Sequence, residues 1–143
     1  MKYAMKKILV PYDGSKNAER GLYKAIYMAR QCDATLVGIF VKYQPGIYAI
    51  HPISFVDGKF MRKVKNFMED AKIKCGRFGV DFTYKIVGGD PGFEIIRHAK
   101  NKKNKIDAIV IGSRGRGALK ESFFGSTSNY VLHKASVPVL LVK

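Results

Sequence analysis

The sequence contains no tryptophan, only two cysteines and no long apolar run. Its longest apolar segments, residues 108–111 and 137–142, have the length of strands, whereas a membrane-spanning helix needs about 18 or more apolar residues. The basic N-terminus is followed by the apolar run 8–10, which is too short for the core of a secretion signal. We therefore expect no association with a membrane.

The two cysteines, Cys32 and Cys75, lie far apart in the chain and form no CxxC motif. Both fall on or beside apolar stripes, so we expect two buried free thiols rather than a disulfide or a redox pair. Free thiols are typical of proteins in reducing compartments. The cysteine usage therefore predicts a cytoplasmic location.

Acidic residues are also scarce, because 11 Asp and Glu oppose 26 Lys and Arg, which gives a formal net charge of +15. A surface with this excess attracts polyanions, so nucleic acid is one candidate partner. The length of 143 residues suits one domain. We expect a single domain over residues 1–143.

Runs of β-forming residues alternate with helical patterns along the chain. Strands are expected over residues 6–11, 35–41, 80–87, 106–111 and 137–142. Helices are expected over residues 15–33, 56–78, 91–101 and 126–134. Strands that alternate with helices indicate a parallel sheet with helices on both faces. Right-handed crossovers then favour a doubly wound α/β fold.

The helix expected over residues 56–78 carries its aromatic residues, Phe60, Phe67 and Phe78, on one apolar stripe. We expect this stripe to face the core, while Lys and Arg fill the other faces. A nucleic-acid binder often shows exposed aromatic residues among its basic ones. With the aromatic residues of this helix turned inward, we do not expect specific nucleic-acid binding, only nonspecific attraction through basic runs such as residues 97–105.

Two loops at the expected carboxyl ends of strands have an unusual composition. Residues 11–15 follow the first strand, and residues 112–117 follow the fourth and lead to residues 125–127 at the start of a helix. Ligands of open α/β sheets bind at this edge. Glycines let backbone N–H groups approach an anion, and a helix start favours negative charge. The second loop is therefore a candidate phosphate site, although a flexible turn before an ordinary helix cap has the same composition.

Asp13 is the only acidic residue that we expect in this site. Its carboxylate is placed to accept hydrogen bonds from ribose hydroxyls, but it is equally suited to cap the first helix or to form a turn with Gly14. Standard nucleotide motifs are absent. The chain has no GxxxxGK[ST] motif, which argues against a P-loop NTPase, and no GxGxxG after the first strand, which argues against a dinucleotide fold of that kind.

Several motifs nevertheless resemble those of one family. Residues 10–15 are similar to the opening signature of the universal stress protein family, and residues 89–91 are similar to the turn before its third helix. The most specific match is Gly112-x2-Gly115 followed by nine residues and then residues 125–127, which resembles the G-x2-G-x9-G-[S/T] pattern of the ATP-binding branch. The apolar ending, residues 137–142, also matches. The resemblance covers the whole chain except residues 43–55, whose role it leaves open.

This resemblance implies a fold and a ligand. The fold would be a three-layer α/β/α domain with a five-stranded parallel sheet in the order 3-2-1-4-5, Rossmann-like and similar to the adenine nucleotide alpha hydrolases. The ligand would be ATP, with ADP and AMP as alternatives and Mg²⁺ as a candidate companion of the phosphates. Asp13 would hold the ribose, and Pro11 and Val41 would border the adenine. The implied nucleotide-binding residues are Pro11, Asp13, Gly14, Ser15, Val41, Ile111, Gly112, Arg114, Gly115, Gly117, Gly125, Ser126 and Thr127.

The implied function is that of a homodimeric, ATP-binding regulatory protein of the stress response. The family dimerises through its last strand, here Val137 to Val142, and an exposed apolar edge strand needs such a cover unless the helices of the chain shield it. The histidines, His51, His98 and His133, are scattered and show no metal-ligand spacing, so we expect slow ATP hydrolysis at most. The alternatives are a dimeric scaffold that does not use nucleotide and a basic nucleic-acid-associated protein.

Overall fold

The computed structural model describes residues 2–44, 58–114 and 124–143. The strands form one five-stranded parallel sheet in the order β3-β2-β1-β4-β5, as predicted. The strands are β1 (Lys7–Pro11), β2 (Thr35–Tyr43), β3 (Phe82–Gly89), β4 (Ala108–Gly112) and β5 (Val139–Val142). The helices are α1 (Lys16–Cys32), α2 (Gly58–Arg77), α3 (Pro91–Lys100) and α4 (Ser126–Lys134), with a short 3₁₀ helix, η3 (Lys102–Asn104), that was not predicted.

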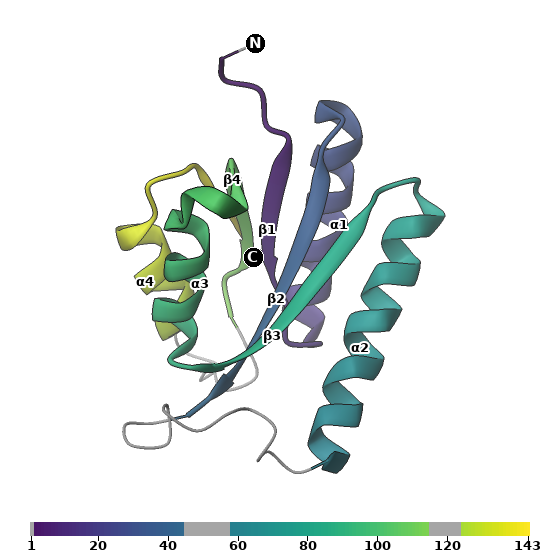
Figure 1. Cartoon of the computed structure of the whole chain (residues 1–143), viewed down its shortest axis with the longest axis vertical. Coiled ribbons are helices and arrows are strands. Elements are labelled where there is room, and N and C mark those ends of the chain that lie inside the picture. Colours follow the sequence, from purple (N-terminus) through teal and green to yellow (C-terminus); the bar gives the residue numbers. More distant parts are fainter. Residues whose placement is uncertain (1, 45–57, 115–123) are drawn as a thin grey trace.

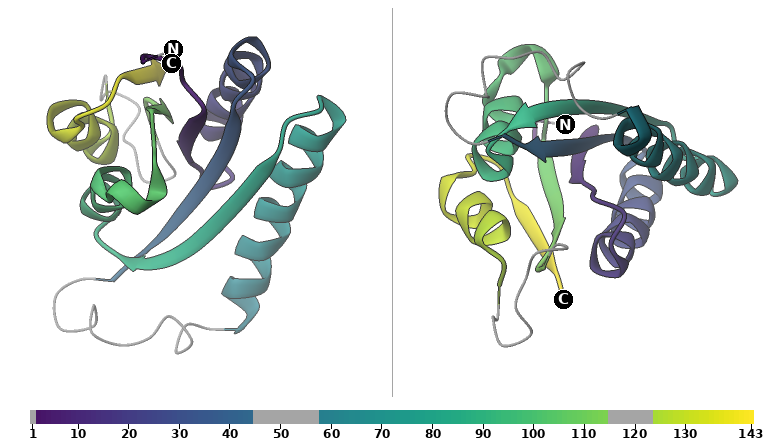
Figure 2. Two further views of the ribbon diagram at one scale, coloured as in Figure 1. Left: turned by 45° about the horizontal axis from the view of Figure 1, so that its top comes forward. Right: turned by 90° about the horizontal axis from the view of Figure 1, so that it is seen from below.

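The sheet lies between two pairs of helices, with α1 and α2 on one face and α3 and α4 on the other (Figures 1 and 2). Alternate residues of the central strand serve the two layers, because successive side chains of a strand point to opposite faces. Ile8 and Val10 pack into the cluster beneath α1 and α2, whereas Leu9 belongs to the cluster beneath α3 and α4. No helix in the described part of the chain is both long and apolar enough to cross a membrane.

Local sequence signals set the helix starts. The Ser15 hydroxyl accepts a hydrogen bond from the Ala18 N–H (3.1 Å), and Asp33 ends α1 in the left-handed conformation with φ of 53°. One Asp90 carboxylate oxygen accepts the Phe93 N–H (2.9 Å), and Pro91 occupies the first turn of α3. These are the capping residues that the sequence predicts for α1 and α3.

The third strand differs from the prediction at both ends. It begins at Phe82 rather than at residue 80 and continues through Gly88 and Gly89, which were expected to break it. Gly88 and Gly89 pair with Lys42 and Tyr43 at the end of the long strand β2. The partner strand therefore decides where β3 ends, because its unpaired N–H and C=O groups are satisfied by extending the ladder.

Two predictions about burial need correction. Phe78 was expected in the core, but it lies beyond the end of α2, is 45% exposed and contacts the ring of Tyr23 edge-on. Cys32 is only partly buried, whereas Cys75 is buried as expected, and both thiols are free. Burial raises the pKa of the Cys75 thiol to about 12, so Cys75 stays protonated and unreactive at neutral pH.

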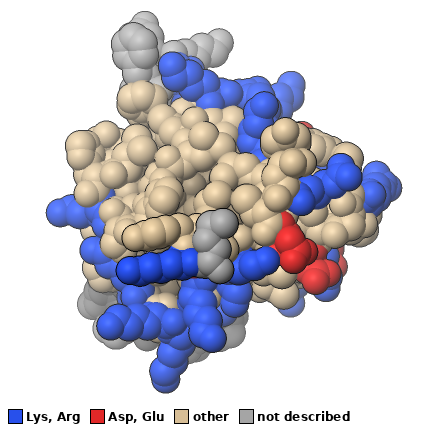
Figure 3. Space-filling model, turned by 90° about the horizontal axis from the view of Figure 1, so that it is seen from above, with Lys and Arg blue, Asp and Glu red and all other residues tan. Residues whose placement is uncertain are grey.

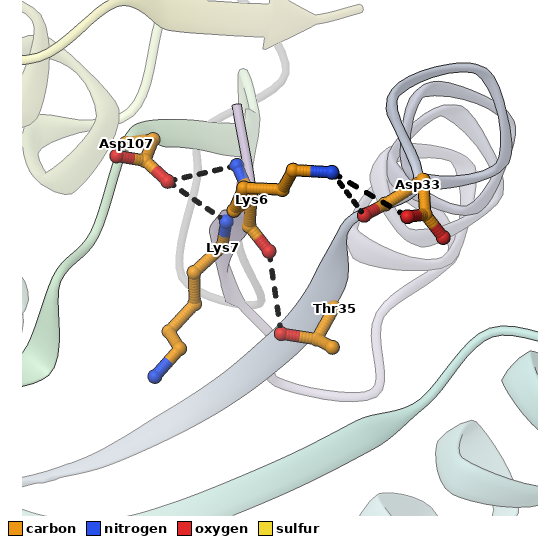
Figure 4. Close-up of polar contacts among 5 residues, drawn as sticks. All are labelled: Lys6, Lys7, Asp33, Thr35 and Asp107. Carbon is orange, nitrogen blue, oxygen red and sulfur yellow. Dashed lines mark hydrogen bonds and ion pairs between the residues drawn. The ribbon is translucent and has the colours of Figure 1, made fainter. Parts of the chain in front are cut away.

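At the amino end of the sheet, the backbone of Lys6 and Lys7 connects β1 to its two neighbouring strands (Figure 4). The N–H groups of Lys6 and Lys7 both donate to one carboxylate oxygen of Asp107, at 2.8 and 2.9 Å, and the Lys6 carbonyl accepts from the N–H of Thr35 at 2.9 Å. Residues just before β4 and at the start of β2 are thereby tied to the same two residues. The exposed Lys6 ammonium donates to the carbonyl and to one carboxylate oxygen of Asp33, each at 3.4 Å.

We predict that Asp107→Ala lowers the free energy of unfolding by about 1–2 kcal/mol, because two backbone donors lose a charged acceptor at a partly buried edge. Equilibrium urea unfolding measures the change. Asp33→Asn is the matched control, since it removes an exposed ion pair but retains a side chain that tolerates the left-handed conformation. An equal loss in both variants would contradict the assignment.

Candidate functional site

A cavity of about 490 Å³ opens at the carboxyl ends of β1 and β4. This volume lies within the range of roughly 300–1,000 Å³ that is usual for small-molecule sites. The walls come from six places: the end of β1 with the loop after it, the start of α1, the end of β2, the start of α3, the end of β4 and the start of α4. The lining residues are Pro11, Tyr12, Asp13, Ala18, Ile39, Phe40, Val41, Tyr43, Asp90, Pro91, Ile95, Ile111, Gly112, Arg114, Gly125, Ser126, Thr127 and Ser128.

The loop after β1 forms a tight turn around Asp13. One Asp13 carboxylate oxygen accepts the Ser15 N–H at 2.9 Å, and Gly14 between them has φ of 77°, which favours glycine. Asp13 thus forms the turn that was one of its predicted roles, and it also lines the cavity. Gly14 and Ser15, although predicted to contact nucleotide, are not among the lining residues; Ser15 instead caps α1.

Tyr12 anchors this loop from below. Its buried ring lies in the cluster beneath α1 and α2 and meets the ring of Phe67 edge-on at 5.9 Å. Burial is the main cause that raises the pKa of the Tyr12 hydroxyl. The Tyr12 N–H also donates to the Ile39 carbonyl at 2.9 Å. The neighbouring Pro11 and Asp13 are therefore held at the cavity by a residue whose ring is packed beneath α1 and α2.

Asn17 is a buried polar residue that the sequence analysis missed. Its amide oxygen accepts the Arg114 N–H at 2.7 Å, and its amide nitrogen donates to the Val142 carbonyl at 3.3 Å. One amide thus fixes the backbone of Arg114 at the cavity and joins it to the edge strand β5. The only signal in the sequence is a polar residue on the inward stripe of α1, one turn before Gly21.

Gly112 makes this arrangement possible by its size. A Cβ at Gly112 would lie 2.5 Å from the Asn17 amide oxygen and 3.1 Å from its backbone oxygen. Glycine at this position is therefore explained by close packing against α1. Because Gly112 has no side chain, α1 can approach the end of β4, and this close approach also brings Gly112 to the cavity wall.

The first turn of α4 forms another wall. Ser128 ties this turn to the end of β4, because its hydroxyl lies 2.9 Å from the Ser113 carbonyl and 3.0 Å from the Gly125 carbonyl. The N-cap residue, Gly125, provides no side-chain hydrogen bond to the helix. The N–H groups that begin a helix carry partial positive charge and favour anions. Ser126 and Thr127, both predicted site residues, lie at this end of the helix and line the cavity.

Gly125 is not required by the fold in the way that Gly112 is. Its φ of −70° is open to any residue, and the nearest atom to an added Cβ would be the Ser113 carbonyl oxygen at 3.5 Å, an ordinary contact. Neither backbone conformation nor packing therefore requires glycine at residue 125. The missing side chain leaves room at the cavity wall, where a ligand could approach the backbone closely.

The remaining walls are apolar, with one acidic residue that was not expected there. Val41 and Ile111, two of the predicted site residues, line the cavity together with Ile39 and Ile95. The expectation that Asp13 is the only acidic residue of the site is wrong, because Asp90 also lines the cavity. Within the described part of the chain, no group of three or more His, Cys, Asp and Glu residues could hold a metal ion. Asp13 and Asp90 are the carboxylates among the lining residues, and oxygen ligands of this kind suit Mg²⁺.

Most of the predicted site residues are brought together. Pro11, Asp13, Val41, Ile111, Gly112, Arg114, Gly125, Ser126 and Thr127 line one cavity although they come from four distant parts of the chain. Gly115 and Gly117 lie outside the described residues. The lining combines apolar side chains, the carboxylates of Asp13 and Asp90, the cationic residue Arg114 and the start of α4.

An open doubly wound sheet with a ligand-sized cavity at its strand reversal defines a class of α/β binding proteins. A family model described as "Universal stress protein family" matches residues 5–143, and the chain belongs to this family. It is 32% identical over 147 aligned positions to universal stress protein YxiE of Bacillus subtilis, with 96% of this chain and 98% of YxiE covered.

Solved structures of the family share the fold. The MJ0577 protein of Methanocaldococcus jannaschii is 30% identical, with a TM-score of 0.84 over 98% of this chain and 96% of that one. A universal stress protein in complex with cAMP (20% identical, TM-score 0.76) covers 98% of both chains. One from Archaeoglobus fulgidus in complex with dAMP (24% identical, TM-score 0.71) covers 99% of both. At these identities the last two show the likeness of fold.

We predict that Gly112→Ala lowers the free energy of unfolding by about 1–3 kcal/mol, because the added methyl group overpacks the contact with Asn17. Gly125→Ser is the matched control at the same cavity. It retains the urea midpoint or raises it, since serine is a favoured N-cap. A loss of stability at Gly125 as large as that at Gly112 would show that both glycines serve packing.

Proposed function

We propose that this protein is a regulatory module that binds an adenine nucleotide, ATP in the first place, and hydrolyses it slowly if at all. The observation that carries the proposal is the joint placement of Asp13, Arg114, Gly125, Ser126 and Thr127 around one cavity with apolar walls. This combination matches the three parts of a nucleotide, which are an apolar base, a hydroxylated sugar and an anionic phosphate chain. The neighbours in complex with cAMP and dAMP support the same ligand class.

Each part of the nucleotide has a chemically suitable wall. Val41 and Pro11 border the region for the adenine, as the resemblance implies. The Asp13 carboxylate is an acceptor for ribose hydroxyls, and one of its oxygens is oriented by the Ser15 N–H. The start of α4, together with Arg114, would attract the phosphates. ADP and AMP fit the same walls with fewer phosphate contacts, so we expect them to bind more weakly.

Fast hydrolysis would need a base or a metal centre against the phosphate. Asp13 and Asp90 each use one oxygen as a turn or cap acceptor for a backbone N–H. His98 lines a separate groove between α3 and strands β2 and β3, which Lys85 and Arg97 also line. Burial and the charges of Lys85 and Lys7 lower its pKa. Binding without rapid turnover is therefore the better match to the groups that line the cavity.

The proposal is tested by placing a negative charge where the phosphates should lie. Ser126→Asp is expected to keep the fold, because an acidic residue in the first turn stabilises a helix, but to abolish ATP binding through repulsion. Asn129→Asp adds the same charge to the same helix at an exposed residue that is not among the lining residues. Isothermal titration calorimetry and the ATP-induced rise in melting temperature measure the difference.

Wild-type protein at millimolar ATP and Mg²⁺ should gain stability, as any ligand of the native state requires. The control variant should gain as much, and Ser126→Asp should gain nothing. Absence of both heat and stabilisation in the wild type would refute nucleotide binding. Equal stabilisation of all three proteins would place the phosphates elsewhere.

We also propose that two copies pair through the edge strand β5. β5 lies at one end of the sheet order, and the Leu140 side chain is 41% exposed on it. An exposed apolar edge is an aggregation hazard unless it is covered, and antiparallel pairing around a two-fold axis would complete the ladder. A dimer of this kind is also what the alternative function, a scaffold that does not use nucleotide, would require.

We predict that Leu140→Lys converts the protein to a monomer, because it places a charge in the apolar centre of the interface. Sedimentation velocity measures the change. Ile73→Lys is the matched control, since Ile73 is exposed on α2, across the sheet from α4. A wild-type monomer, or a dimer that survives the Leu140 change, would contradict an interface at β5.

A further inference from the structure

The outer face of α1 carries an exposed stripe that the nucleotide cavity does not use. Lys16, Arg20, Tyr23, Tyr27 and Arg30 follow one another at steps of four, three, four and three residues, which is the spacing of a single helix face. All five are exposed. The two tyrosines, 44% and 64% exposed, therefore lie between cationic side chains at both ends of the stripe.

Helix α2 is the neighbour of α1 on the same face of the sheet (Figures 1 and 2). Phe78, which directly follows α2, contacts Tyr23 of α1 and so extends the aromatic surface. Its ring lies 6.3 Å from that of Tyr23 at an interplanar angle of 90°. The adjacent Arg77 is exposed. Three exposed rings and four cations thus share one surface, which we call the α1 surface and define as Lys16, Arg20, Tyr23, Tyr27, Arg30, Arg77 and Phe78.

Glu19, the acidic neighbour of Arg20 in the chain, is already engaged. Glu19 of α1 is paired with Lys74 of α2, which also pairs with Asp70 at 2.9 Å. None of the ion pairs between described residues uses Lys16, Arg20, Arg30 or Arg77. The scarcity of acid is general, since blue Lys and Arg groups outnumber red Asp and Glu groups on the face shown in Figure 3.

We propose that the α1 surface binds single-stranded nucleic acid without strong sequence preference. Bases would stack on the rings of Tyr23, Tyr27 and Phe78, and phosphates would contact the flanking Lys and Arg side chains. This is the combination of aromatic platforms and cations that recognises single strands. A duplex hides the faces of its bases, and a second copy of this chain would bring like charges together.

The sequence argued against a specific nucleic-acid partner because the aromatic residues of the second helix were expected to face the core. Phe78 does not, and the two tyrosines of α1 are exposed as well. The inference does not depend on the nucleotide cavity, which lies at the carboxyl ends of the strands.

Fluorescence anisotropy with labelled oligo(dT) and oligo(U) of about 12 nucleotides, within the usual site size, tests the proposal. An RNA–DNA difference would show which single strand is preferred. We expect Tyr23→Ala combined with Tyr27→Ala to weaken binding of either oligomer by about tenfold or more at every salt concentration. Because the chain has no tryptophan, its fluorescence comes from tyrosine, and the fraction quenched on binding should be smaller in this variant.

The cationic side chains give a separate signature. Arg20→Ala combined with Arg30→Ala should flatten the plot of log affinity against log salt by about 1.4, that is about 0.7 for each lost phosphate contact on a single strand. The tyrosine variant should leave this slope unchanged. Melting temperatures close to that of the wild type show that both variants are folded.

Two matched controls remove the same chemistry elsewhere. Lys102→Ala with Lys103→Ala deletes two exposed charges on η3, and Phe93→Ala deletes an exposed ring on α3. Both should bind as the wild type does, and a duplex of equal length should bind more weakly than either single strand. Equal losses in the controls would overturn the proposal in favour of a general charge field.

Two further outcomes would also overturn it. Displacement of the oligonucleotide by saturating ATP would place it in the cavity rather than on α1. Vesicles of anionic phospholipid that bind the wild type but not the tyrosine variant, while oligonucleotide binding is unchanged, would make the α1 surface a membrane-contact surface.

Discussion

The structure depends on one constraint, which is that crossovers between parallel strands are right-handed. With β1 at the centre of the sheet, the chain first builds outward through β2 and β3 on one side and then adds β4 and β5 on the other. The loop after β1 therefore leads to α1 on one face, and the loop after β4 leads to α4 on the opposite face. The two loops diverge, and the cavity lies where they separate.

Helix α1 connects the parts of this arrangement. Its inward side chain Asn17 bonds the backbone of Arg114 at the cavity and that of Val142 on the edge strand. The Ser113 N–H donates to the same Val142 carbonyl at 2.7 Å. The cavity wall and the edge strand are thus positioned by the same few hydrogen bonds. The outer face of α1 takes no part in these hydrogen bonds, and it carries the exposed tyrosines between cationic side chains.

Positive charge is found in three regions of the protein, which are the cavity, the outer face of α1 and the run that ends in η3. At the cavity, the cationic residue Arg114 and the start of α4 line the wall, and the N–H groups that begin a helix carry partial positive charge. On α1, cations flank two aromatic rings, whereas the run that ends in η3 has exposed lysines around a short 3₁₀ turn. All three regions contribute to the net charge of +15. Only the cavity and the α1 surface combine positive charge with a cavity or with exposed aromatic rings.

The sequence by itself determined the order of elements, the parallel sheet and the loops that line the cavity. These follow from local causes, since apolar periodicity, capping residues such as Ser15 and Asp90, and glycine-rich breaks act over a few residues. Membership of the family was also visible in short motifs. Asp13 shows the limit of local reasoning, because its turn with Gly14 was one of several predictions that the sequence could not separate.

Only the tertiary structure decided the rest. The role of Asn17, the presence of Asp90 in the cavity, the continuation of β3 through Gly88 and Gly89, and the exposure of Phe78 all depend on which elements lie side by side. Gly112 and Gly125 look alike in a motif, yet one is required by contact with α1 and the other is not. Such differences arise from contacts between residues distant in the chain, and no local pattern records them.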